Sequence, residues 1–207
     1  MWVGNITAIV LMTVNSKGSP RAPSVVHQFS HTQWPLLIQR ATPGPKTQMV
    51  NRHTITMLQK CRTRLPCLIA DGDIVFHRHI KMHLQRALNV APPSTHALHL
   101  CPGCLYNRYP ADPSKIWQKL PPERNVTGKK DSSGLLYMES PFDMCWYGGP
   151  VAALFLSKAG IDAAINAFIK WKDTPCDVVY NMLPHHYPLV TPLCREGNAR
   201  LKDDPNL

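Results

Sequence analysis

Acidic residues and long apolar runs are both scarce in this chain of 207 residues. Asp and Glu together number 13 against 23 Lys and Arg, so the formal net charge is +10 with histidine counted as neutral. Such a charge favours an anionic partner, and a phosphate-bearing small molecule, nucleic acid and an acidic membrane surface all satisfy it. No apolar segment approaches the roughly 20 residues of a membrane-spanning helix, so the sequence predicts no membrane span.

Charged residues make up only 17% of the chain, whereas there are 20 prolines and an ordinary 44% of hydrophobic residues. A chain of this length fits one domain and can bury a real core. Because proline interrupts both helices and sheets, we expect short regular elements joined by long loops. The region 18–46, which holds five of the prolines, is the first of these expected loops.

An odd number of cysteines rules out complete pairing within one chain. Reduced thiols and one or two disulfides in a secretory lumen are both compatible with the seven cysteines present. The apolar N-terminal segment has no basic n-region and no clear cleavage site, so we interpret it as a first strand. Localisation stays open between the cytoplasm and the lumen of the secretory pathway.

Strand-like and helix-like segments alternate along the chain, which is typical of an α/β fold with a mostly parallel sheet. Helices are expected where apolar residues recur at helical spacing, and strands where aliphatic runs are short. The expected helices cover 48–62, 79–88 and 157–169, the last with Ser157 as its N-cap. The expected strands cover 6–14, 65–76, 97–100, 135–138, 152–156 and 189–190.

The strand predicted over 65–76 is interrupted by Asp71-Gly72-Asp73. Two aspartates separated by one residue can face one site when the chain turns between them, and Gly72 permits that turn. Carboxylate oxygens are the ligands that hard divalent cations prefer, and a diphosphate requires such a cation. The triplet therefore predicts a metal and diphosphate site, with a solvated Asp-Gly turn as the alternative.

Together with its flanking aliphatics, this triplet resembles the central strand of glycosyltransferase family 25, which includes lipooligosaccharide and procollagen galactosyltransferases. In that family an acidic triplet lies between aliphatic residues and a phenylalanine, as in LIADGDIVF here. Gly72 stands where the family usually has a second acid. The later segment ALFLSKAG is similar to the family's strand followed by a Ser-led helix.

A third matching segment is Pro175-Cys176-Asp177, closed by a proline and a Leu-Val pair at 188–190. The resemblance makes Asp177 the candidate for the catalytic or acceptor-site carboxylate, acting as general base if the enzyme inverts. A helix N-cap is the alternative role for Asp177. Gly148 and Gly149 are candidates for close approach of the backbone to the donor, with an ordinary turn as the alternative.

The resemblance implies a single domain over 1–207 of the Rossmann-like type called GT-A. Residues 1–64 would form a shortened or divergent nucleotide-binding part and 65–195 the core. The implied reaction is transfer of a hexose from a nucleotide-diphosphate donor to a hydroxyl of a glycan or protein acceptor. Asp71 and Asp73 would hold manganese or magnesium. No nucleic-acid partner is expected, and a catalytically inactive relative is an alternative because of Gly72.

A different class of function is indicated by His96, His99, Cys101 and Cys104, which lie within nine residues. These are zinc ligands by type, and they define the alternative of a basic, zinc-containing nucleic-acid-binding module. Their close spacing argues against it, because small zinc modules usually take their ligand pairs from separated segments.

Two further histidine groups are interpreted as solvated. His79 and His83 share one face of the predicted helix 79–88, and no glutamate of the protease type lies between them. His185 and His186 fall in a proline-bounded stretch and are expected to be exposed.

Overall fold

The computed structural model describes residues 3–12, 29–30, 32–42, 44–72, 74–77, 79–100, 128–130, 136–138, 152–181, 183–189 and 193–196. Within them, six strands form one sheet in the order β2-β1-β3-β8-β5-β9. They are β1 (Thr7–Met12), β2 (Leu36–Arg40), β3 (Cys67–Asp71), β5 (Ala97–His99), β8 (Ala152–Phe155) and β9 (His186–Pro188). Only β8 is antiparallel to its neighbours in this sheet. The prediction of an α/β fold with a mostly parallel sheet is confirmed.

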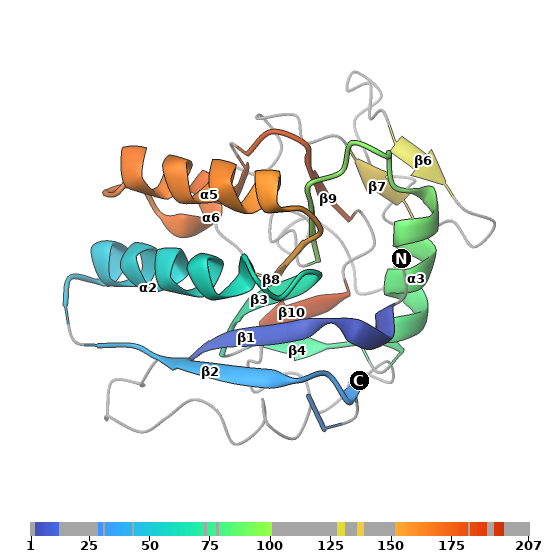
Figure 1. Ribbon diagram of the computed structural model, residues 1–207, viewed down its shortest axis with the longest axis horizontal. Helices are drawn as coiled ribbons and strands as arrows, with labels where there is room; N and C mark the ends of the chain where they lie inside the picture. The colour runs from blue at the N-terminus through green and yellow to red at the C-terminus, as the bar shows by residue number, and fades with distance from the viewer. Residues whose placement is uncertain are drawn as a thin grey trace.

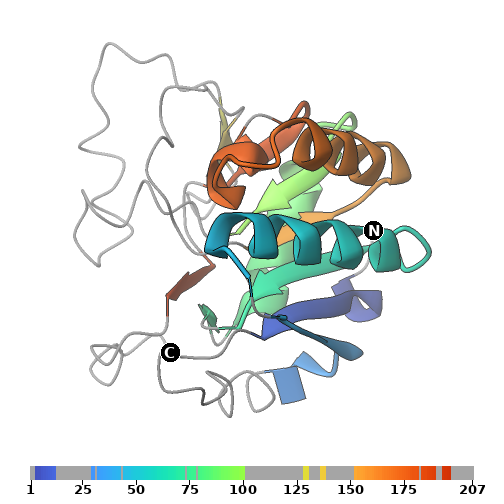
Figure 2. The ribbon, with the colours of Figure 1, turned by 90° about the vertical axis from the view of Figure 1, so that its left-hand side faces the viewer.

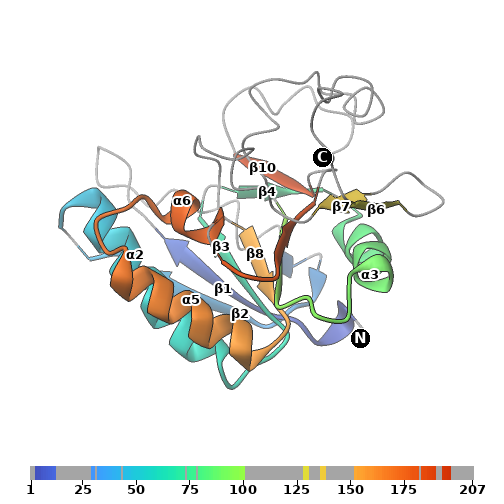
Figure 3. The same cartoon turned by 90° about the horizontal axis from the view of Figure 1, so that it is seen from above.

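Helices cover both faces of the sheet. They are α2 (Lys46–Cys61), α3 (Ile80–Val90), α5 (Lys158–Lys170) and α6 (Cys176–Asn181), with a short 3-10 helix η1 (Val3–Asn5) before β1. Figure 1 and Figure 3 show α2, α5 and α6 together on one side, with α3 on the other. Among the described residues, no helix is long and apolar enough to cross a membrane.

The alternation of side chains along each strand supplies two separate cores. In β1, Ala8 and Val10 belong to the core beneath α3, and Ile9 and Leu11 belong to the core beneath α2, α5 and α6. The strand is buried on both faces, which explains why its sequence is continuously apolar rather than alternating. The same holds for β3 and β8.

The predicted strand over 65–76 is corrected to two strands in different sheets. Strand β3 ends at Asp71, and β4 (Ile74–Phe76) pairs antiparallel with β10 (Cys194–Glu196) in a separate two-stranded sheet. The chain turns at Gly72, so the polar triplet lies where it leaves the main sheet. The aliphatic residues before and after the triplet have the same sequence pattern. That pattern therefore does not indicate that β3 and β4 pair with different strands.

Two further expectations about strands are wrong. The region 18–46, predicted as a loop, contains β2, which lies at an edge of the main sheet and is half exposed. The last strand of that sheet is β9 rather than 189–190. A short hairpin of β6 (Gly128–Lys130) and β7 (Leu136–Met138) includes the strand expected at 135–138.

A disulfide joins the last residue of α2 to the first residue of β3. The Cα atoms of Cys61 and Cys67 are 5.5 Å apart, and both side chains are buried. Cys194 is also disulfide-bonded, whereas Cys176 is a free thiol. The described cysteines therefore include both disulfide-bonded residues and a free thiol.

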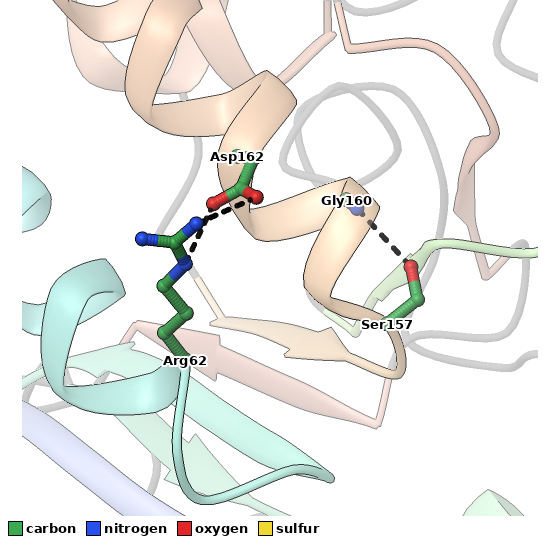
Figure 4. Close-up of polar contacts among 4 residues, drawn as sticks. All are labelled: Arg62, Ser157, Gly160 and Asp162. Atoms are coloured by element: carbon green, nitrogen blue, oxygen red, sulfur yellow. Dashed lines mark hydrogen bonds and ion pairs between the residues drawn. The ribbon is translucent and has the colours of Figure 1, made fainter.

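The predicted N-cap of α5 is confirmed. Ser157 Oγ accepts a hydrogen bond from the backbone N–H of Gly160 at 3.1 Å (Figure 4). On the neighbouring turn, the Arg62 guanidinium forms an ion pair with Asp162, with Nε 3.0 Å from Oδ1. These contacts fix the start of α5 against the end of α2.

Candidate functional site

The carboxyl ends of β1 and β3 form the edge of the sheet where a ligand is expected. The two strands are parallel neighbours, and Leu11 of β1 lies opposite Asp71 of β3. Strand β2 lies on one side of β1 and β3 on the other, so the connections diverge between β1 and β3. In open α/β sheets, such a topological switch point is where ligands bind outside the strands' carboxyl ends. Asp71, the last residue of β3, lies at this point.

The alternation in β3 determines the side of the sheet on which Asp71 lies. Cys67 and Ile69 belong to the core beneath α2, α5 and α6. Asp71, two residues further on, follows the same alternation and is half-buried. Its side chain is therefore directed toward the helical layer that contains α6.

Helix α6 brings a second predicted carboxylate to the same place. The pKa of the Cys176 thiol is raised first by burial and then by the negative charges of Asp71 and Asp177. The pKa of Tyr180, one turn further along α6, is raised by burial, by Cys176 and by Asp71. Both aspartates are therefore near enough to Cys176 for their charges to act on its thiol.

The alternative role of Asp177 as a helix N-cap is not observed. Helix α6 begins at Cys176, so Asp177 lies inside its first turn. Asp177 Oδ1 accepts a hydrogen bond from the backbone N–H of Val178 at 3.0 Å, and the side chain is half-buried. A carboxylate with this access to solvent can bind a ligand or accept a proton from one.

Behind this cluster, buried aromatic rings extend into the core. The rings of Tyr180 and His186 meet edge to face with centroids 5.8 Å apart, and the centroids of His99 and His186 are 5.6 Å apart. His186 Nδ1 donates to the carbonyl oxygen of Tyr180 at 2.7 Å. Within the described part of the chain, the Tyr180 hydroxyl and His186 Nε2 are buried without a hydrogen-bond partner.

The expectation that His186 is exposed is therefore wrong. Its side chain is 4% exposed, and burial lowers its pKa to about 4. His185 is exposed as expected. The two adjacent histidines differ because β9 begins at His186, so only the second enters the sheet. Cys176 and Tyr180 were not predicted as neighbours of Asp71, because only the folded chain brings α6 near the end of β3. His186 of β9 is connected to them through its contact with the Tyr180 ring.

Several of the predicted site residues lie outside the described residues, namely Asp73, Gly148, Gly149, Cys101 and Cys104. In the part of the chain that the structure describes, no group of three or more His, Cys, Asp or Glu side chains could hold a metal ion.

Of the four residues proposed as zinc ligands, the structure describes His96 and His99. These two side chains lie in different environments. His99 lies in the core beside Tyr180 and His186. The ring of His96 contacts that of His185, and its Nδ1 lies 2.8 Å from Ser157 Oγ. These two histidines are thus already used in packing and in positioning the start of α5.

The expectation that His79 and His83 lie on a solvated face is correct for only one of them. His79 is exposed, whereas His83 is half-buried and its ring meets that of His77 edge to face with centroids 4.7 Å apart.

Comparison with known proteins does not identify this chain. No protein-family model matches it, and no curated protein sequence matches it. A function therefore has to be argued from its own residues.

Proposed function

We propose that this chain is a glycosyltransferase of the GT-A type that transfers a hexose from a nucleotide-diphosphate donor to a hydroxyl acceptor. The observation that carries the proposal is the position of Asp71 at the carboxyl end of β3, in register with the end of β1. A switch point of this kind is where α/β sheets bind nucleotides. Asp177, the residue carried over as the catalytic carboxylate, acts on the same Cys176 thiol as Asp71, and this supports the proposal further.

The described carboxylate at this point, that of Asp71, is of a ligand type that suits a divalent metal. Manganese and magnesium prefer carboxylate oxygens, and Asp71 offers these from a half-buried position. In the proposal, Asp71 and Asp73 hold the metal. When bound, it offsets the negative charge that develops on the departing diphosphate.

The protein's own contribution to transfer is assigned to Asp177. The bond between the sugar's anomeric carbon and the phosphate oxygen breaks, and a bond to the acceptor oxygen forms. The acceptor hydroxyl loses its proton, which Asp177 takes up if the reaction inverts the anomeric centre. The diphosphate leaves with the electron pair of the broken bond.

Donor binding is tested by thermal unfolding in the presence of manganese and a panel of uridine diphosphate sugars. We expect one donor to raise the melting temperature of the wild type but not that of Asp71→Asn. Asp162→Asn is the matched control, because it makes the same change where the carboxylate pairs with Arg62. A wild-type protein that responds to no sugar nucleotide would refute the proposal.

The catalytic role of Asp177 is tested separately by measuring release of the nucleoside diphosphate. Loss of a general base slows transfer by about 10²–10⁴-fold. We expect Asp177→Asn to show this loss while the donor still raises its melting temperature. Turnover at the wild-type rate would remove Asp177 from the mechanism without affecting the assignment of Asp71.

A further inference from the structure

The C-terminal end of α5 exposes two large apolar side chains that lie two residues apart in the sequence. Ile169 is 60% exposed and Trp171, which caps the helix, is 40% exposed. Both lie beyond Phe168, the last residue of the helix that contributes to the core. Neither side chain belongs to the buried core.

Basic residues accompany these apolar side chains at the end of α5 and at the beginning of α2. Lys170 and Lys172 are exposed, and Lys170 Nζ lies 5.2 Å from the centroid of the Trp171 ring. The adjoining first turns of α2 add the exposed Lys46 and Arg52. We call the six residues the α5-end patch: Lys46, Arg52, Ile169, Lys170, Trp171 and Lys172. An acidic residue, Asp173, follows Lys172 and accepts a hydrogen bond from Gln48 Nε2 at 2.9 Å.

The patch is held in place by α2. Asn51 is buried, and its Nδ2 donates to the carbonyl oxygens of Lys172 and Thr174, each at 2.8 Å. These bonds fix the chain that follows α5 against the beginning of α2. The exposed apolar and basic side chains are therefore presented by a rigid support.

We propose that the α5-end patch binds the surface of an anionic lipid bilayer. Tryptophan prefers the membrane interface, where its ring lies among the headgroups, and lysine extends its charge toward them from an apolar stem. Basic residues near an anionic bilayer each add to the attraction. The local excess of cations over Asp173 supplies the charge complementarity that this surface requires.

The position of the patch relates it to the candidate site. Helix α2 begins directly after β2, at the carboxyl edge of the parallel strands, and α5 ends beside that beginning. Figure 1 shows both helix ends on its left-hand side, and Figure 2 looks onto this edge. A bilayer bound at the patch would lie on the same side of the molecule as Asp71. The inference itself does not depend on the proposed function.

Sedimentation with phosphatidylcholine vesicles, with and without phosphatidylserine, tests the proposal. We expect the wild type to bind only the vesicles that contain phosphatidylserine, and to be released by salt. Each of Lys170→Gln and Lys172→Gln should weaken binding about fivefold, because a basic residue near the surface contributes about 1 kcal/mol. Ile169→Ser with Trp171→Ser should weaken it further.

The matched control makes the same kinds of change on α3. Lys81→Gln with Met82→Ser alters a lysine next to an apolar side chain that is 50% exposed, on the opposite face of the sheet. Binding should be unchanged in this variant. Circular dichroism of every variant checks that the fold is intact.

Three outcomes would overturn the proposal. One is a folded wild type that binds no phosphatidylserine vesicles, and another is equal loss of binding in the α5-end and α3 variants. The third is self-association in analytical ultracentrifugation that the α5-end substitutions abolish, which would make the patch an interface between copies of the chain.

Discussion

Lowering the pH from 7 to 5 should destabilise this protein through one buried histidine. His186 has a pKa of about 4 in the folded chain, because burial opposes its charged form, against an ordinary value of 6.5. Below pH 6.5 the unfolded chain therefore takes up a proton that the folded chain refuses. The contribution of His186 to the free energy of unfolding is fully present above pH 6.5 and is lost as the pH falls toward 4. Each pKa unit corresponds to about 1.4 kcal/mol, so the full loss is about 3 kcal/mol, with about 2 kcal/mol of it present by pH 5.

The assay is urea unfolding of the wild type and of His186→Asn at the two pH values. Asparagine does not titrate, and its Nδ2 can replace Nδ1 as the donor to the Tyr180 carbonyl oxygen. The variant is less stable overall, but its difference between pH 7 and pH 5 should be smaller by about 2 kcal/mol. His53, whose pKa is lowered by burial and by Arg52, contributes in the same direction to both proteins.

His79→Asn is the control for this measurement, because the side chain of His79 is exposed. It should retain the wild-type difference between the two pH values. If His186→Asn also retained that difference in full, the acid sensitivity would arise elsewhere, and our reading of His186 as a buried neutral base would be refuted.

Two further predictions concern packing and covalent structure. A Cβ on Gly160 would lie 2.7 Å from His96 Cβ and 3.1 Å from its carbonyl oxygen. Gly160→Ala should therefore cost about 1–3 kcal/mol by overpacking, which exceeds the helix-propensity gain of about 1 kcal/mol; unchanged or higher stability in urea would contradict this. The disulfide between Cys61 and Cys67 closes a short loop and should contribute about 2 kcal/mol by the loop-entropy relation. Dithiothreitol should lower the urea midpoint of the wild type by more than that of Cys61→Ala/Cys67→Ala, in which the disulfide of Cys194 can still be reduced; equal shifts in the two proteins would show that the bond between Cys61 and Cys67 does not form.

The elements predicted correctly from the sequence are those set by local rules. Helix α5 has a serine cap, a helical stripe of apolar residues and no internal proline, and its observed start agrees with that pattern. Strand β3 is the aliphatic run in the first half of the strand predicted over 65–76, although its end at Asp71 was not predicted. Both were recognisable because residues close together in sequence determine them.

What the sequence did not reveal depends on partners far along the chain. The apolar run in β2 is short and follows a proline, and it becomes a strand because β1 offers it a hydrogen-bonding edge. Strand β4 is continuous in pattern with β3 but pairs with β10. His186 is a polar residue that is buried because β9 pairs with β5, which brings His186 into the sheet opposite Ala97. Pairings at long range leave little trace in a single sequence.

The candidate site was predicted by residue type, and the fold gives a structural role to Gly72, one of the positions that depart from the pattern of the family that the sequence resembles. Gly72, where a second acid is usual, is buried at the turn between β3 and β4. The side chain of an acidic residue at position 72 would lie in the interior of the protein. Burying a charge without a partner is costly. In this chain Gly72 is therefore suited to the turn, and its presence is not evidence that a ligand was lost. The assignment of metal binding depends on the aspartates on either side of it, and Asp71→Asn is the substitution that tests it directly.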